Sequence, residues 1–226
     1  MSTAQAVAER RLPCPPAAAP GREWLTDARI DAAERLLVLA LYFWLAGRLL
    51  YHWWFQGQVG NLLLLPSEGL VVLFMLIRRR ANEVSRRPGE WLLALGATCA
   101  PMLVQPGDGT GPVPPAVGIF FILFGTIIQL HAKVALGRSM GMVPANRGLR
   151  LAGPYRFVRH PMYAGYLLGH LGFLLMNPTW WNLAVYALCY GLQVPRLLAE
   201  ERLLSRDPGY REYRAKVRYR LVPGIF

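Results

Sequence analysis

The chain has 226 residues, of which 54% are hydrophobic and 17% are charged, and its mean hydropathy is +0.27. This composition is too apolar and too poor in charge for a soluble domain of this size, so it predicts a membrane protein. The net charge of +12 does not indicate a nucleic-acid partner, because the basic residues lie in short segments between long apolar runs. There they would orient the chain in a lipid bilayer.

The N-terminal segment lacks the apolar core of a signal peptide, since its first 23 residues contain Glu9, Arg10, Arg11, prolines and an alanine run. It has little apolar surface to offset the entropy of ordering, so we expect residues 1–30 to be a flexible segment. The chain's cysteines lie far apart and none has a metal-ligand or redox spacing. We therefore expect structural cysteines and no metal site.

Six apolar runs follow, and each is a candidate helical membrane span. Three of the runs are short, and the third could be only half inserted. The predicted fold class is all-α: a polytopic helical membrane protein, with residues 31–115 as a transmembrane scaffold and a cytosolic, amphipathic C-terminal segment. The runs lie near residues 35–55, 61–77, 91–105, 116–136, 161–176 and 179–204.

Basic residues are confined to alternate connections between these runs. By the rule that basic loops stay in the cytosol, both termini should be cytosolic. The segments without lysine or arginine are 52–61, 105–116 and 177–179, whereas arginines gather in 78–87, 138–159 and 202–220.

Two charged residues, Arg48 and Glu68, interrupt the first and second runs at equal distances from the middle of the connecting loop. In an antiparallel hairpin they would lie at similar depth, and charges buried in a membrane must pair or reach water. We expect an ion pair between them. Independent contact with water, or a role in substrate binding, is the alternative.

The most informative stretch is the turn at residues 153–165, which has the sequence GPYRFVRHPMYAG. Gly-Pro marks a turn, and Pro161 suits the first position of a helix, where its missing N–H would be unpaired anyway. The free amides of this helix start would suit a carboxylate or phosphate of a ligand. Arg156 and Arg159 could be mere topology markers, with the tyrosines as interface anchors. Because a histidine, a proline, two tyrosines and two glycines share this turn, we favour a functional site.

A second group of polar residues lies at the end of the last run, where residues 195–201 have the sequence PRLLAEE. Pro195 should kink the helix and free a carbonyl. Arg196 and Glu200 are four residues apart and share a helix face, which would also fit a simple intrahelical ion pair. After them, residues 210–223 have the pattern of an amphipathic segment that lies on an anionic membrane surface.

Together, these two stretches resemble the isoprenylcysteine carboxyl methyltransferase and phospholipid methyltransferase group of membrane enzymes. The resemblance covers residues 116–226, which we predict to be the catalytic core. Those enzymes carry a Gly-x-Tyr-x-x-x-Arg-His-Pro-x-Tyr-x-Gly turn, and residues 153–165 match it at every fixed position. They also carry an Arg, a Glu-Glu pair four residues later, a Tyr-x-x-Tyr and a late Arg-x-x-Pro, which correspond to Arg196, Glu200 and Glu201, Tyr210 and Tyr213, and Arg220 and Pro223.

The resemblance implies S-adenosyl-L-methionine as the cofactor, in a pocket roofed by the C-terminal segment. In the stretch 147–150 only the backbone is expected to contact it, because the side chains differ from those of the family. Arg196 corresponds to a substrate-contacting arginine and, with His160, is the expected catalytic residue. The expected cofactor-binding residues are Arg147, Gly148, Leu149, Arg150, Tyr155, His160, Pro161, Tyr163 and Glu200.

The resemblance implies a lipid-like or prenylated substrate that enters from the bilayer, but the sequence leaves the methylated atom open. A carboxylate acceptor is ionised at pH 7 and needs no general base, and Arg196 could orient it. An amine acceptor would have to lose a proton to His160 or Glu200.

Two alternatives to a methyltransferase remain. Membrane sterol and steroid reductases use NADPH and share a closely related turn, but they usually place an acidic residue directly after its last glycine. This chain has Tyr166 there, which favours the methyltransferase. The other alternative is a non-catalytic membrane protein of the same fold.

The connection at residues 177–179 is short, so the last two runs should be antiparallel neighbours. The start of one then lies beside the end of the other. We therefore expect His160, Tyr163 and Glu200 to share one cavity, with the C-terminal segment folded over its opening.

Overall fold

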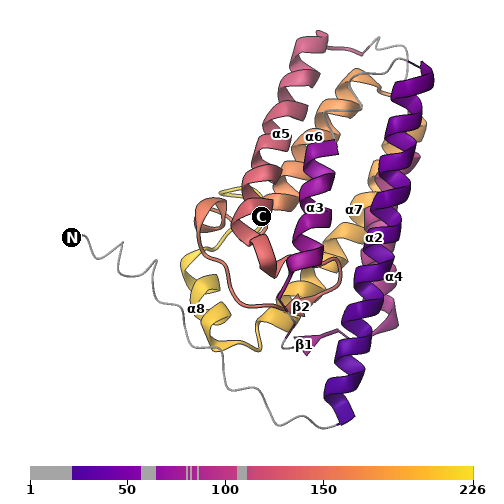
Figure 1. Cartoon of the computed structure of the whole chain (residues 1–226). Coiled ribbons are helices and arrows are strands. Elements are labelled where there is room, and N and C mark those ends of the chain that lie inside the picture. The colour runs from indigo at the N-terminus through magenta and orange to yellow at the C-terminus, as the bar shows by residue number, and fades with distance from the viewer. Residues whose placement is uncertain are drawn as a thin grey trace.

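A computed structural model describes residues 22–56, 65–79, 81, 83–85, 87–105 and 111–225. The predicted α-helical class is confirmed, since helices dominate this part of the chain (Figure 1). Short 3₁₀ turns extend or precede several of them: η2 (Ala100–Leu103), η3 (Gly137–Ser139) and η4 (Gly153–Arg156). The α-helices are α2 (Arg22–Gln56), α3 (Leu65–Ile77), α4 (Pro88–Cys99), α5 (Pro115–Leu136), α6 (Pro161–Met176), α7 (Trp180–Leu204) and α8 (Pro208–Lys216).

Each of the six predicted apolar runs coincides with one of the helices α2 to α7. Among the described helices, one segment, Pro115–Ser139, is long and apolar enough by itself to cross a membrane, with a hydropathy of 1.9. The other helices do not meet this test within the described residues, so the number of crossings stays a prediction. Helix α2 begins at Arg22, earlier than the first apolar run. Residues 1–21 lie outside the described part of the chain.

The expected ion pair between Arg48 and Glu68 also falls outside the described residues, because the side chain of Glu68 is not among them. Arg48 itself is exposed, and its guanidinium lies 3.5 Å from the carbonyl oxygen of Met102.

Helices α5 and α6 pack closely along their length because glycines face each other at two levels. A Cβ added at Gly125 would lie 2.6 Å from the carbonyl oxygen of Gly165, and one added at Gly172 would lie 2.5 Å from that of Gly118. Such small-residue contacts allow two helix backbones to approach, as is common between membrane helices. This packing fixes the start of α6, and therefore the predicted functional turn, against the end of α5.

Helix α4 and turn η2 run antiparallel to α7 over nearly its full length. At one end the Arg202 guanidinium lies 3.5 Å from the Glu90 carboxylate. At the other end, the side chain of Asn182 exchanges two hydrogen bonds of 2.9 Å with the backbone of Gln105. The third apolar run thus lies along α7 from Arg202 to Asn182, a rise of about 30 Å at 1.5 Å per residue.

A small sheet that the sequence did not predict joins two loops at one end of the bundle. Strand β1 (Glu83–Val84) pairs antiparallel with β2 (Ala145–Asn146). Two-residue strands are too short to carry an alternating hydrophobic pattern, which explains why sequence reasoning missed them. The pairing connects the segment after α3 to the segment before the predicted functional turn, and Figure 1 shows both strands and α8 at this end.

Candidate active site

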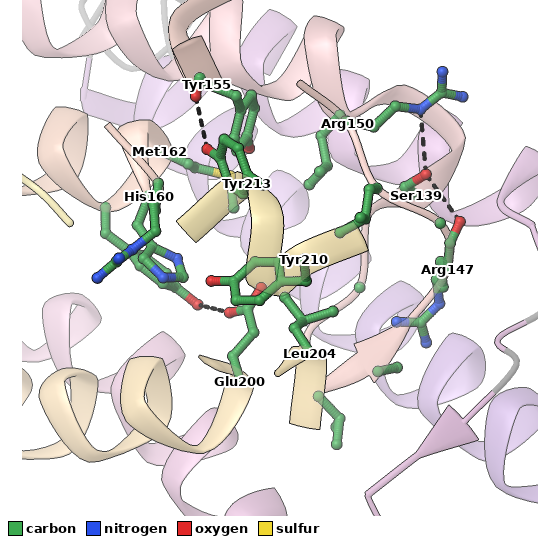
Figure 2. A pocket seen from close by; sticks show the side chains of 18 residues that line it. Ser139, Arg147, Arg150, Tyr155, His160, Met162, Glu200, Leu204, Tyr210 and Tyr213 are labelled. Carbon is green, nitrogen blue, oxygen red and sulfur yellow. Dashed lines mark hydrogen bonds between the residues drawn. The ribbon is translucent and has the colours of Figure 1, made fainter. Parts of the chain in front are cut away.

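A cavity lies where α5 ends, α6 begins and α7 ends, and α8 covers it. Its walls therefore come from four helices and from the loop 139–150 that follows α5. The lining residues are Leu136, Ser139, Gly141, Val143, Ala145, Arg147, Gly148, Leu149, Arg150, Tyr155, Arg159, His160, Met162, Tyr163, Glu200, Leu204, Tyr210 and Tyr213 (Figure 2).

The turn that leads into α6 is fixed both by its own residues and by α8. Gly153 has φ +63°, a left-handed conformation that favours glycine, and it starts η4. Helix α6 then begins at Pro161, as predicted. Tyr213 of α8 donates a hydrogen bond of 2.6 Å to the carbonyl oxygen of Tyr155. Figure 2 shows this contact at the edge of the cavity.

His160, Tyr163 and Glu200 line the same cavity, so the predicted juxtaposition is confirmed. The Tyr163 hydroxyl donates a hydrogen bond of 3.1 Å to Glu200 Oε2. The His160 and Tyr163 rings are stacked with centroids 5.6 Å apart. Glu200 makes no ion pair among the described residues, so its carboxylate charge is available to a cationic ligand.

Glu201, next to Glu200, faces a different set of groups and is only 4% exposed. Its Oε1 lies 2.8 Å from Arg159 Nε and 3.3 Å from His160 Nε2. Its Oε2 lies 3.0 Å from Arg220 Nε. One buried carboxylate thus joins the turn before α6 to the C-terminal tail. The family resemblance marked Glu201 as part of the Glu-Glu pair but assigned it no role.

The C-terminal tail also pairs with the turn through its backbone. The N–H groups of Arg159 and His160 donate to the carbonyl oxygens of Tyr219 and Arg220, both at 2.9 Å. The tail is therefore fixed beside the cavity by backbone and side-chain contacts together. This arrangement agrees with the expected roof, although its amphipathic docking on a membrane stays a prediction.

Tyr210 of α8 is only 3% exposed, and its hydroxyl is buried without a hydrogen-bond partner among the described residues. Figure 2 shows its side chain across the middle of the site, between Glu200 and Tyr213. Burial raises the pKa of Tyr210 and of Tyr213 above the usual phenol value, so both stay protonated at neutral pH. An unpaired buried hydroxyl costs free energy, so this group is suited to a polar atom of a ligand.

The loop 139–150 is held by contacts of its own and by a contact with α2. The Arg147 guanidinium turns away into an ion pair of 2.7 Å with Glu34 of α2. Ser139 Oγ donates a hydrogen bond of 3.1 Å to the Arg147 carbonyl oxygen, and Arg150 Nε lies 3.4 Å from the same hydroxyl. Gly148 has φ +90°, which only glycine adopts readily.

Two predicted site residues, Pro161 and Arg196, are not among the lining residues. The buried Arg196 donates a hydrogen bond of 2.7 Å to the Met142 carbonyl oxygen, and its guanidinium lies 5.6 Å from the centroid of the Tyr163 ring. It therefore lies directly behind the cavity wall. Its substrate contact stays a prediction. Within the described part of the chain, no group of three or more His, Cys, Asp or Glu side chains could hold a metal ion.

Comparison with known proteins shows two similarities. Residues 114–208, which contain both predicted motifs up to the Glu-Glu pair, match the phospholipid methyltransferase family. The resemblance to this family is therefore confirmed over that segment. The chain is also 32% identical over 146 residues to a cobalt-zinc-cadmium resistance protein, CzcN, of Cupriavidus metallidurans. That match covers 61% of this chain and 65% of the relative, so about a third of the relative lies outside it.

Proposed function

We propose that this protein is a membrane methyltransferase that uses S-adenosyl-L-methionine to methylate a lipid-like or prenylated substrate. The observation that carries the proposal is one cavity lined by Glu200, by residues 147–150 and by Tyr210, whose hydroxyl has no hydrogen-bond partner among the described residues. A carboxylate beside a buried hydroxyl that lacks a partner suits a ligand with a cationic centre and a polar amino-acid end.

The residues of the cavity fit the cofactor in charge and hydrogen bonding. The sulfonium and ammonium groups of S-adenosyl-L-methionine are cationic, and Glu200 offers a carboxylate that Tyr163 orients through its hydroxyl. Tyr210 offers its free hydroxyl to a polar atom. When bound there, the cofactor would supply a methyl group for in-line displacement.

The chain's own residues would then hold the reactants and exclude water. The tail and α8 cover the opening through the Glu201 contacts and the Tyr213 hydrogen bond, and water exclusion strengthens every charge interaction beneath them. Arg196, which lies behind Tyr163, would attract an acidic substrate group through its charge. This favours a carboxylate acceptor, for which no base is required. For an amine acceptor, His160 or Glu200 would take the proton.

Several features support a membrane location and an active site at its cytosolic surface. Large apolar side chains are exposed along the bundle, as expected for a surface that faces lipid. Examples from α2 and α5 are Phe43, Trp54, Phe120 and Ile127. The arginine-rich connections and the cavity lie at the same end of the bundle, which would be the cytosolic end by the distribution of positive charge.

Binding of radiolabelled cofactors to the purified protein in lipid nanodiscs tests the proposal. We expect saturable binding of S-adenosyl-L-methionine, competed by S-adenosylhomocysteine, and no saturable binding of NADPH. Saturable NADPH binding alone would establish the reductase alternative. Binding of neither cofactor would support the non-catalytic alternative and contradict the proposal.

The proposed topology has a separate test. A reporter fused after the last residue should report a cytosolic C-terminus. An extracytoplasmic signal would contradict the orientation and, with it, the cytosolic position of the cavity.

A further inference from the structure

Helix α2, in the half of the chain that carries no family motif, places a buried carboxylate against the loop of the candidate site. The side chain of Glu34 is fully buried, with 0% exposure. Its Oε1 accepts hydrogen bonds from the backbone N–H groups of Met142 and Val143, at 2.7 and 3.0 Å. These bonds connect α2 to a loop more than one hundred residues away in sequence.

The second oxygen of the same carboxylate holds two arginines. Glu34 Oε2 lies 2.7 Å from Arg147 and 3.1 Å from Arg78. Asp31, one turn earlier on α2, lies 2.7 Å from Arg78 and 3.5 Å from Arg147. Both arginine side chains are at most 2% exposed, so this is a buried ionic cluster rather than a surface ion pair.

The contacts of Glu34 lead directly to the cavity. Val143 and Arg147 line it. The carbonyl oxygen of Met142, whose N–H bonds to Glu34, accepts the 2.7 Å hydrogen bond from Arg196. Glu34 therefore holds the N–H groups of a segment that contributes to the cavity wall and whose Met142 carbonyl oxygen anchors Arg196.

We propose that Glu34 is a positioning residue for the cofactor site, which it controls by holding the backbone of residues 142–147. This inference rests on the proposed function. It gives the N-terminal half a direct part in the site, beyond the scaffold role expected from its sequence. Asp31 shares the arginines but bonds to no backbone N–H of the loop among the described contacts, so it serves as a matched control.

The test compares Glu34→Gln with Asp31→Asn in the full-length protein in nanodiscs. Glutamine keeps the size of the side chain but removes its charge and turns an amide toward the arginines. Hydrogen–deuterium exchange should become faster in the peptide that covers residues 140–150 of Glu34→Gln, while α5 and α6 stay protected as in the wild type. The Kd for S-adenosyl-L-methionine should rise roughly tenfold or more, since small displacements of positioning groups cost up to about 10²-fold. Asp31→Asn should leave both measurements close to wild type, even where its Tm falls.

A second variant covers the case in which Glu34→Gln does not fold. Glu34→Asp keeps the charge for the arginines but is one methylene shorter, so it cannot reach both backbone N–H groups. We expect faster exchange in the same peptide with a near-wild-type Tm. Wild-type exchange of this peptide in the folded Glu34 variant would overturn the inference, as would an equal effect of Asp31→Asn on exchange and Kd. If the wild type itself binds no S-adenosyl-L-methionine, the proposed function fails, and the exchange experiment still decides whether Glu34 holds the loop.

Discussion

Two buried carboxylates hold segments that surround the cavity, Glu201 on α7 and Glu34 on α2, and they do so in different ways. Glu201 contacts two arginines and one histidine side chain, from the turn before α6 and from the C-terminal tail. Glu34 collects two backbone N–H groups and two arginines, from the loop after α5 and the segment after α3. The first fixes the roof and the second fixes the wall. In both cases, a single carboxylate on a helix holds a segment that is not itself helical. Removing each carboxylate in turn therefore shows how much each segment depends on it.

The largest effect on stability is expected from Glu201→Ala, which removes the carboxylate that faces the buried Arg159 guanidinium and the partly exposed Arg220. Removing one member of a buried charge cluster costs about 3–5 kcal/mol, and the partial exposure of Arg220 places this case toward the lower end. Thermal unfolding in nanodiscs should show a lower Tm, and trypsin should cut the tail faster at Lys216 and Arg218. The exposed Glu212→Ala is the control and should change the stability by less than about 0.5 kcal/mol. An intact, protease-resistant tail in Glu201→Ala would show that the cluster does not hold the roof.

The next largest effect on stability is expected from the packing of α5 against α6. Gly125→Ala would place a methyl group 2.6 Å from the Gly165 carbonyl oxygen, and overpacking of this kind costs about 1–3 kcal/mol. Gly191 in α7 has nothing within 4 Å of an added Cβ, so Gly191→Ala should be neutral or stabilising by up to about 1 kcal/mol. The two variants compared by Tm separate close packing from helix propensity. A Gly125→Ala protein as stable as Gly191→Ala would contradict the close approach of α5 and α6.

The two tyrosines of α8 have different expected roles. Tyr213 should hold α8 over the cavity, whereas Tyr210 should contact the ligand. Tyr213→Phe removes a hydrogen bond to Tyr155, so it should lower the free energy of unfolding by about 0.5–1.5 kcal/mol. Tyr210→Phe removes a hydroxyl without a described partner, so stability should stay the same or rise. Its Kd for S-adenosyl-L-methionine should rise by roughly three- to tenfold, which corresponds to the loss of one hydrogen bond to the ligand. Destabilisation by Tyr210→Phe with unchanged affinity would mean that its hydroxyl does not face the ligand.

The smallest effect is expected from the exposed pair between Arg202 and Glu90. Surface ion pairs contribute about 0–1 kcal/mol, and this one is long at 3.5 Å with the arginine more than half exposed. Arg202→Ala should therefore leave Tm and cofactor affinity near their wild-type values. A loss comparable to that of Glu201→Ala would contradict the distinction between buried and exposed charges.

The sequence predicted what depends on local pattern. Apolar runs located α2 to α7, because membrane and core helices both require continuous apolar surface. The turn at residues 153–165 and the Glu-Glu pair located the cavity, because a short connection after α6 brings its start beside the end of α7. Pro161 marked the helix start correctly for the same local reason.

The sequence could not predict contacts between segments far apart in the chain. Glu34 looks like an ordinary acidic residue near the start of an apolar run, and only the folded chain brings it to Met142. The strands β1 and β2 are too short for a pattern. The direction of the Arg147 side chain, away from the cavity and into this cluster, likewise depends on α2.

The central claim is that Glu200, which lines the cavity and makes no ion pair among the described residues, binds the cation of the cofactor. Isothermal titration of S-adenosyl-L-methionine into Glu200→Ala and Glu212→Ala tests it most directly, because both variants lose one glutamate from the same end of the protein. The account predicts that Glu200→Ala still folds, with a Tm lowered only by the lost hydrogen bond from Tyr163, but loses measurable binding, and that Glu212→Ala binds like the wild type. Wild-type affinity in a folded Glu200→Ala protein would contradict the assignment of this cavity as the cofactor site.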